Sequence, residues 1–147
     1  MRQIVTGVDA DGRSCVIAEH PQGVASNDFT SSSGDRMSSY TAFETASSPA
    51  PPRPAGNGQF MDLEVPVGFL RFSVVHWPPG AENPMHHTDS IDFDTVLEGS
   101  IDIILEDGRH HLEVGDAVIV TGVDHAWEAG PSGATLSVFV LGTPRPA

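Results

Sequence analysis

Apolar and polar residues alternate along several short stretches in the second half of the chain, and turn-forming residues separate them. Residues 69–77 and 136–141 are rich in β-branched and aromatic side chains, which favour strands. Residues 93–105 predict two strands that break at Glu98-Gly99, and Asp107-Gly108 is typical of a hairpin turn. No stretch shows a clear 3.6-residue apolar period. The pattern therefore predicts an all-β sandwich or barrel of about nine or ten strands.

The first third of the chain is more polar and richer in turns. Residues 2–6 and 13–18 predict a hairpin in which Gly12 supplies the positive φ of the turn. Residues 47–58 hold four prolines and two glycines, which predicts an extended surface connection.

The chain is expected to form one domain over residues 1–147. Residues 1–46 contain too few apolar side chains to fold alone. We therefore expect residues 1–60 to add strands and a Pro/Ser-rich loop to a barrel over residues 68–141, or to exchange strands across a dimer.

Composition narrows the classes of partner. Seven Lys and Arg oppose twenty Asp and Glu, which gives a formal net charge of −13. Such a surface repels nucleic acid and anionic membranes. The single cysteine, Cys15, excludes an intrachain disulfide and is consistent with a reducing compartment. Without an apolar leader or a membrane-length apolar run, the sequence predicts a soluble cytoplasmic protein.

Candidate chemistry concentrates between Pro79 and Gly99. A Pro-Gly turn is followed by His86 and, six positions later, by Asp92. His125 occupies a similar position downstream, after a glycine-bounded apolar run. Imidazole and carboxylate are ligands that borderline divalent cations accept. We therefore predict a metal site that a β-barrel assembles from these two segments.

The order and spacing of these residues resemble the two motifs of small single-domain cupins. The residues that carry the resemblance are Gly80, His86, Asp92, Gly99, Gly115, Gly122 and His125. Two ligand positions depart from the usual pattern, because Thr88 replaces the second histidine and Asp92 replaces a glutamate. Ala129 stands in place of an asparagine. The resemblance covers roughly residues 68–141 and implies the cupin double-stranded β-helix, a jelly-roll-like barrel.

The resemblance also implies a ligand set and a pocket. His86, Asp92 and His125 would hold a divalent metal ion such as Fe, Zn, Mn or Ni and leave positions open for a substrate. Strand alternation places Thr88 on the same side as His86 and turns His87 outward. Asp94 shares a side with Asp92 and is a candidate catalytic carboxylate. Thr88 is the other catalytic candidate, and it could help Asp92 reach the metal through a water.

Two further side chains are candidates for the pocket itself. His76 ends a strand just before the prolines, so we expect it at the pocket mouth. Trp127 lies two residues after His125 and should share its face, so we expect it in the pocket wall.

Several functions fit this arrangement. The first hypothesis is a metal-dependent enzyme that dehydrates, isomerises or decarboxylates a small organic molecule. The alternatives are an Fe(II) dioxygenase, a metal-free acid–base enzyme and a non-catalytic cupin that only binds a small ligand. The fold does not choose among them, because cupins host many functions. By resemblance, we also expect a homodimer.

Overall fold

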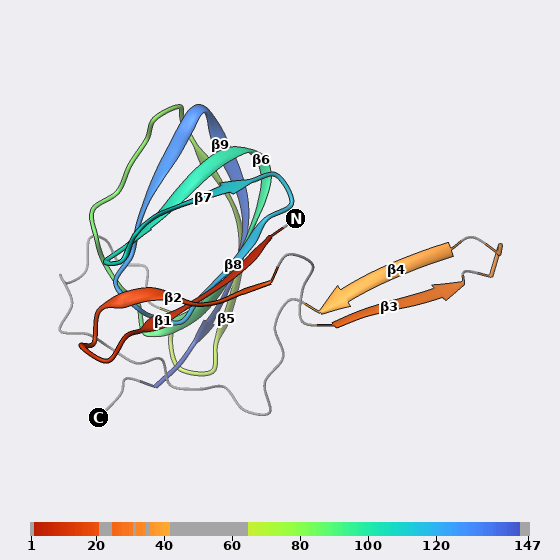
Figure 1. The fold of residues 1–147 in the computed structure, drawn as a ribbon, viewed down its shortest axis with the longest axis horizontal. Coiled ribbons are helices and arrows are strands. Elements are labelled where there is room, and N and C mark those ends of the chain that lie inside the picture. Colours follow the sequence, from red (N-terminus) through yellow and green to blue (C-terminus); the bar gives the residue numbers. More distant parts are fainter. Residues whose placement is uncertain (1, 21–24, 31, 35, 42–64, 145–147) are drawn as a thin grey trace.

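The computed structural model describes residues 2–20, 25–30, 32–34, 36–41 and 65–144. Within these ranges the chain forms strands and no helix, which confirms the predicted all-β class (Figure 1). The strands are β1 (Gln3–Val8), β2 (Ser14–His20), β3 (Ala25–Thr30), β4 (Arg36–Thr41), β5 (Leu70–Trp77), β6 (Ser90–Leu105), β7 (Gly108–Glu113), β8 (Ala117–Val120) and β9 (Ala126–Gly142).

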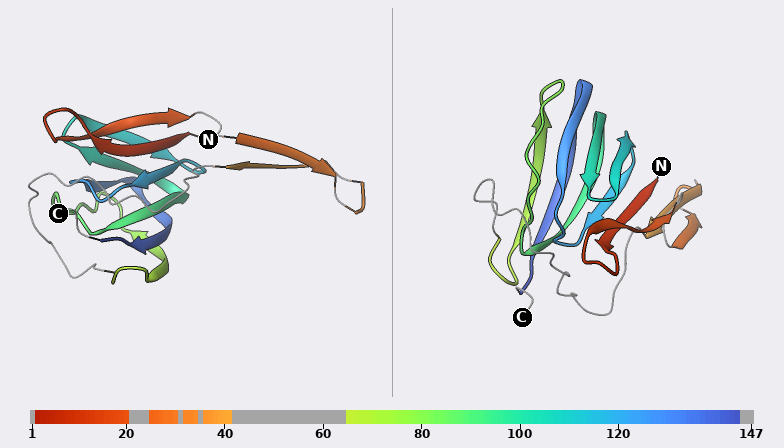
Figure 2. Two further views of the ribbon diagram at one scale, coloured as in Figure 1. Left: turned by 90° about the horizontal axis from the view of Figure 1, so that it is seen from below. Right: turned by 60° about the vertical axis from the view of Figure 1, so that its left-hand side comes forward.

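One curved sheet contains seven of these strands and wraps around the core (Figures 1 and 2). Its order is β2-β1-β8-β6-β9-β5, and β7 pairs with β6 beside this path. β3 and β4 form a separate antiparallel hairpin that projects away from the curved sheet (Figure 2). The predicted Pro-rich connection at residues 47–58 lies outside the described residues.

The predicted N-terminal hairpin extends the main sheet, as expected. β1 pairs antiparallel with β2 and parallel with β8, so the N-terminal strands continue the sheet of the C-terminal half. Gly12 has a φ of 78° in the turn, and Ile4 is completely buried in the main core cluster. Residues 2–20 therefore share the sheet and the core of the barrel.

The predicted break at Glu98-Gly99 is wrong, because β6 is one long continuous strand. β6 passes through Glu98-Gly99 with an irregular register against β9 instead of ending there. Gly99 has a φ of 69°, and a Cβ at this position would come within 2.0 Å of the Gly133 carbonyl oxygen. The glycine therefore lets one strand bend around the barrel where the sequence pattern suggested a turn.

The core sits between the strands of the C-terminal half. Its largest buried side chains include isoleucine and leucine residues from β6 and β7 and valines from β8. Trp127 joins this cluster from β9, and Trp77 packs against it from β5. In the described residues there is no helix long and apolar enough to cross a membrane.

Candidate functional site

His86 and His125 lie in neighbouring segments of the barrel, although they are distant in the sequence. Their backbones form an isolated β-bridge, in which each N–H donates to the other carbonyl at 2.9 and 2.8 Å. The ring centroids lie 4.4 Å apart. Both residues are nearly inaccessible, with exposed fractions of 4% and 3%. The chain thus brings the two predicted histidines side by side.

The backbone also fixes the tautomer of both rings. Nδ1 of His86 donates to the Pro84 carbonyl at 2.9 Å, and Nδ1 of His125 donates to the Val123 carbonyl at 2.8 Å. Because a carbonyl only accepts, the ring proton is on Nδ1 and the lone pair is on Nε2. Burial lowers the pKa of His86, and burial together with the His86 charge lowers that of His125 to about 3. Both imidazoles are neutral at pH 7.

A chain of hydroxyl groups leads from Thr88 to Asp92. The Ser90 hydroxyl donates to the Asp92 carboxylate at 2.6 Å. The Thr88 and Ser90 hydroxyl oxygens lie 2.7 Å apart, and because Ser90 uses its own proton on Asp92, Thr88 donates in this pair. Two hydroxyl groups in series therefore orient the Asp92 carboxylate.

Asp94 lies beside Asp92 on the same face of β6. Residues two apart in a strand point to the same side, and both carboxyl groups line one cavity. Asp94 is only 5% exposed, and its Oδ1 has no hydrogen-bond partner. A buried polar atom of this kind is costly unless a ligand or another group satisfies it.

The shared low-dielectric environment raises the pKa of both carboxyl groups. Burial raises the pKa of Asp92 to about 6, although the Ser90 hydrogen bond and the Arg71 charge oppose the rise. Burial and then the neighbouring Asp92 charge raise the pKa of Asp94 well above its ordinary value. Both carboxyl groups therefore keep their protons to a higher pH than an exposed aspartate does.

These groups surround a cavity of about 320 Å³ inside the barrel. Among the described residues, ten polar ones line it: Arg71, Ser73, Glu82, Asn83, His86, Thr88, Ser90, Asp92, Asp94 and His125. The apolar wall consists of Val75, Trp77, Trp127, Leu136, Val138 and Val140. A small apolar cavity with a few convergent polar groups is the usual form of a small-molecule site.

The structure gathers most of the predicted site residues. His86, Thr88, Asp92, Asp94, His125 and Trp127 all line this cavity. His76 does not: it lies on the opposite face of β5 from Val75 and Trp77 and borders a separate hollow of about 280 Å³. Its Nδ1 lies 3.0 Å from the Thr135 hydroxyl oxygen. Strand alternation excludes it from the pocket mouth where we expected it.

Two other residues flank the histidine bridge from behind. His87 does not line the cavity, as the alternation argument predicted. Its Nδ1 lies 2.8 Å from an Asp124 carboxylate oxygen. Asp124 is only 3% exposed, so its side of this pair is buried. This pair ties the His86 segment to the His125 segment.

Sequence reasoning missed Ser90 and Arg71. Ser90 could have been found from its two-residue spacing to both Thr88 and Asp92, which places all three on one side of an extended segment. Arg71 carries no local signal, because its place at the cavity depends on how β5 pairs with β9.

The predicted metal-binding set is assembled only in part. Both imidazoles present an Nε2 lone pair, which is the form that a metal accepts, and a carbonyl fixes each ring from behind. Within the part of the chain that the structure describes, however, no three His, Cys, Asp or Glu side chains are grouped closely enough to hold a metal ion. Asp92 therefore does not complete a three-ligand site with His86 and His125.

The site thus consists of a curved all-β sheet around an interior cavity, with two bridged histidines beside that cavity. Residues 73–141 match the family model of the cupin domain. This part of the chain is a cupin domain, which confirms the resemblance seen in the glycine and histidine spacing.

Two curated relatives match part of the chain. Phomopsin biosynthesis cluster protein C′ of Diaporthe leptostromiformis is 38% identical over 66 residues, which cover 44% of this chain and 34% of that protein. A cupin-domain-containing oxidoreductase of Neurospora crassa is 27% identical over 84 residues, which cover 54% of this chain and 43% of that protein. The matched stretch thus spans about a third of the first relative and less than half of the second.

Among solved structures, the cupin domain of Schizosaccharomyces pombe Cnp3 is similar in fold. The match has a TM-score of 0.46 and 20% sequence identity, and it covers 50% of this chain and 56% of that chain.

Proposed function

We propose that this chain is an enzyme that moves protons on a small organic molecule bound in the cupin cavity. The observation that carries the proposal is the pair of carboxyl groups, Asp92 and Asp94, side by side on β6 in one low-dielectric cavity. Two neighbouring acids with different protonation states supply a base and an acid at the same pH. The reactions that suit such a pair are dehydrations and isomerisations.

Asp92 is the proposed base. Its pKa of about 6 keeps it ionised at neutral pH and still basic enough to accept a proton from carbon. Asp94 is the proposed acid, because its carboxyl group keeps its proton. In a dehydration, Asp92 takes a proton from carbon as the double bond forms. Asp94 gives its proton to the leaving hydroxyl group, which departs as water, and a proton then returns from Asp92 to Asp94.

Thr88 and Ser90 have a positioning role in this proposal. Their hydroxyl chain ends on Asp92, which orients the carboxylate toward the cavity and moderates its basicity. The neutral histidines add Nε2 atoms that accept a hydrogen bond from a substrate hydroxyl group.

The experiment is a proton-exchange screen in deuterated water. Small 3-hydroxy and 3-oxo compounds, each offered as an acid and as an amide, are incubated with the protein and followed by proton NMR. We expect loss of a C–H signal or formation of an alkene, and loss of both in Asp92→Asn and Asp94→Asn. Asp102→Asn is the matched control, because Asp102 lies on β6 outside the cavity. Ligand binding without any exchange would contradict the proposal and favour a binding module.

A metal-dependent enzyme is the second candidate. The observation that favours it is the carbonyl-fixed tautomer of His86 and His125, whose Nε2 atoms would hold the ion. When bound, such an ion would act as a Lewis acid or, as iron, support oxygen chemistry like that of an oxidoreductase.

Metal analysis of protein purified without a histidine tag tests this candidate. Stoichiometric metal that is lost in both His86→Ala and His125→Ala would support it. Exchange activity that survives a chelator in metal-free protein would contradict it.

A further inference from the structure

We infer that the cavity takes small carboxylic acids, with the ligand carboxylate held by Arg71 and Ser73 and the reacting carbon placed against Asp92 and Asp94. This inference names the substrate class of the proposed function and rests on it. It comes from the register of three neighbouring strands, which places these four side chains in two parallel rows.

The first row crosses the sheet from Arg71 to Asp92. Arg71 on β5 pairs with Val140 on β9, and Val140 pairs with Asp92 on β6. The second row lies two residues further along the strands, where Ser73 pairs with Val138 and Val138 pairs with Asp94. Each row therefore has a polar residue at either end and a valine in the middle.

All six residues line the same cavity. Neighbouring strands lie about 4.8 Å apart, so the backbones at the two ends of a row are roughly 10 Å apart. A ligand that spans a row meets a cation or hydroxyl group, then an apolar floor, and then the acid pair. This sequence of environments fits a molecule with a carboxylate, a short apolar body and a reactive carbon beyond it.

The charge of Arg71 selects the ligand's terminal group. Among the described residues that line the cavity, Arg71 is the only lysine or arginine. A guanidinium group binds a carboxylate through two parallel hydrogen bonds, a geometry that a neutral amide cannot match. The chain as a whole carries a formal net charge of −13, so a local cation is needed to favour an anionic ligand over its neutral analogue.

The tryptophan residues of the chain can be used to detect ligand binding at this site. It has two tryptophans, Trp77 and Trp127, and both line the cavity. Intrinsic tryptophan fluorescence therefore reports ligand entry directly.

The experiment compares three matched pairs: butanoate, 4-methylpentanoate and 3-phenylpropanoate, each against its primary amide. We expect at least one acid to bind about tenfold more tightly than its amide. Arg71→Gln should abolish this preference by weakening the acid alone. Arg109→Gln is the matched control, since Arg109 lies on the exposed outer surface, and it should keep the preference.

Equal binding of acids and amides would overturn the inference, as would failure of every acid to bind at millimolar concentration. A preference that survives Arg71→Gln would overturn it as well. These failures are distinct from failure of the proposed function. Proton exchange without a preference for acids would contradict the substrate class but not the acid–base pair. A preference for acids without proton exchange would support the binding site but contradict the catalysis.

Discussion

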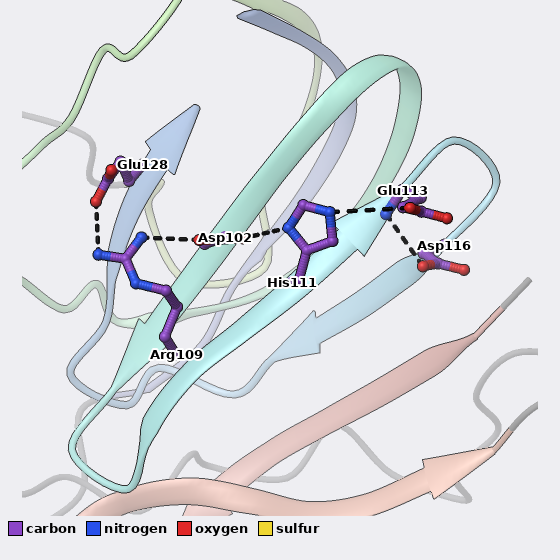
Figure 3. A network of polar contacts seen from close by, with 6 residues as sticks. All are labelled: Asp102, Arg109, His111, Glu113, Asp116 and Glu128. Carbon is purple, nitrogen blue, oxygen red and sulfur yellow. Dashed lines mark hydrogen bonds and ion pairs between the residues drawn. The ribbon is translucent and has the colours of Figure 1, made fainter. Parts of the chain in front are cut away.

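β6 carries aspartates in two different environments, one inside the cavity and one on the outer surface. Outside, Asp102 accepts a hydrogen bond from Arg109 at 2.8 Å and another from His111 (Figure 3). Arg109 also donates to Glu128 at 2.6 Å. Inside, Asp92 has a hydroxyl donor and Asp94 has an unsatisfied oxygen.

The pKa shifts run in opposite directions in the two environments. Burial acts to raise the pKa of Asp102, but the hydrogen bonds from Arg109 and His111 outweigh it and hold the pKa below its usual value. In the cavity, burial prevails and raises the pKa of Asp92 and Asp94. The ion pair with Arg109 favours the ionised form of Asp102, whereas burial favours the protonated form of Asp92 and Asp94. The second arrangement is the one from which an active site can be built.

Removing the base should have the largest effect. Asp92→Asn leaves the shape of the side chain but cannot accept a proton, so we expect activity to fall by about 10² to 10⁴-fold. The measurement is the rate of C–H exchange in deuterated water. Asp102→Asn should retain the rate of the unaltered protein. An active Asp92→Asn protein would show that another group is the base.

Burial of the Asp94 carboxyl group should make the free energy of unfolding depend on pH. Above pH 3.8 the unfolded Asp94 loses its proton while the native carboxyl group keeps it, so the free energy of unfolding falls as pH rises toward the native pKa. Asp94→Asn removes this dependence. The variant should gain up to about 1.4 kcal/mol per pH unit over that window and nothing below it, as measured by urea unfolding. A constant difference at all pH values would contradict the buried acid.

The hydroxyl chain should set the pH at which activity begins. Activity is expected to rise as pH passes through about 6, because Asp92 must lose its proton. Since the Ser90 hydrogen bond lowers this pKa, Ser90→Ala should move the midpoint to higher pH. Thr88→Ala should move it less, because Thr88 acts through Ser90. If the midpoint is unchanged in both variants, the two hydroxyl groups do not control the pKa of Asp92.

The surface aspartate should show the smallest effect, with the opposite pH dependence. The pKa of Asp102 is lowered in the native state, so its contribution is present above the unfolded value near 3.8 and is lost as pH falls through the native one. Asp102→Asn should lower the melting temperature by about 3 °C or less at pH 7. The difference should vanish in strong acid, as calorimetry can check.

The sequence predicted the local parts of this molecule well. The glycines at the motif positions, Gly80, Gly99, Gly115 and Gly122, all have positive φ, a requirement that depends on local backbone geometry. The continuity of β6 was not predictable, because a glycine that permits a turn also permits a bend within one strand.

The site was predicted where spacing along one segment decides it. Alternation puts Thr88 on the side of His86 and Asp94 on the side of Asp92, and the cupin resemblance points Asp92 inward. All four line the cavity. His76 was misplaced, because a difference of one residue in a strand moves a side chain to the other face. Arg71 could not be found, because only non-local pairing of β5 with β9 brings it to the cavity.

The most direct test of the central claim is a carbon-13 NMR titration of the aspartate carboxyl groups. We predict that Asp92 titrates near pH 6, that Asp94 titrates well above 3.8, and that Asp102 titrates below 3.8. If Asp92 and Asp94 instead titrate together near 3.8, the cavity holds no stored proton and the proposed acid–base function is contradicted.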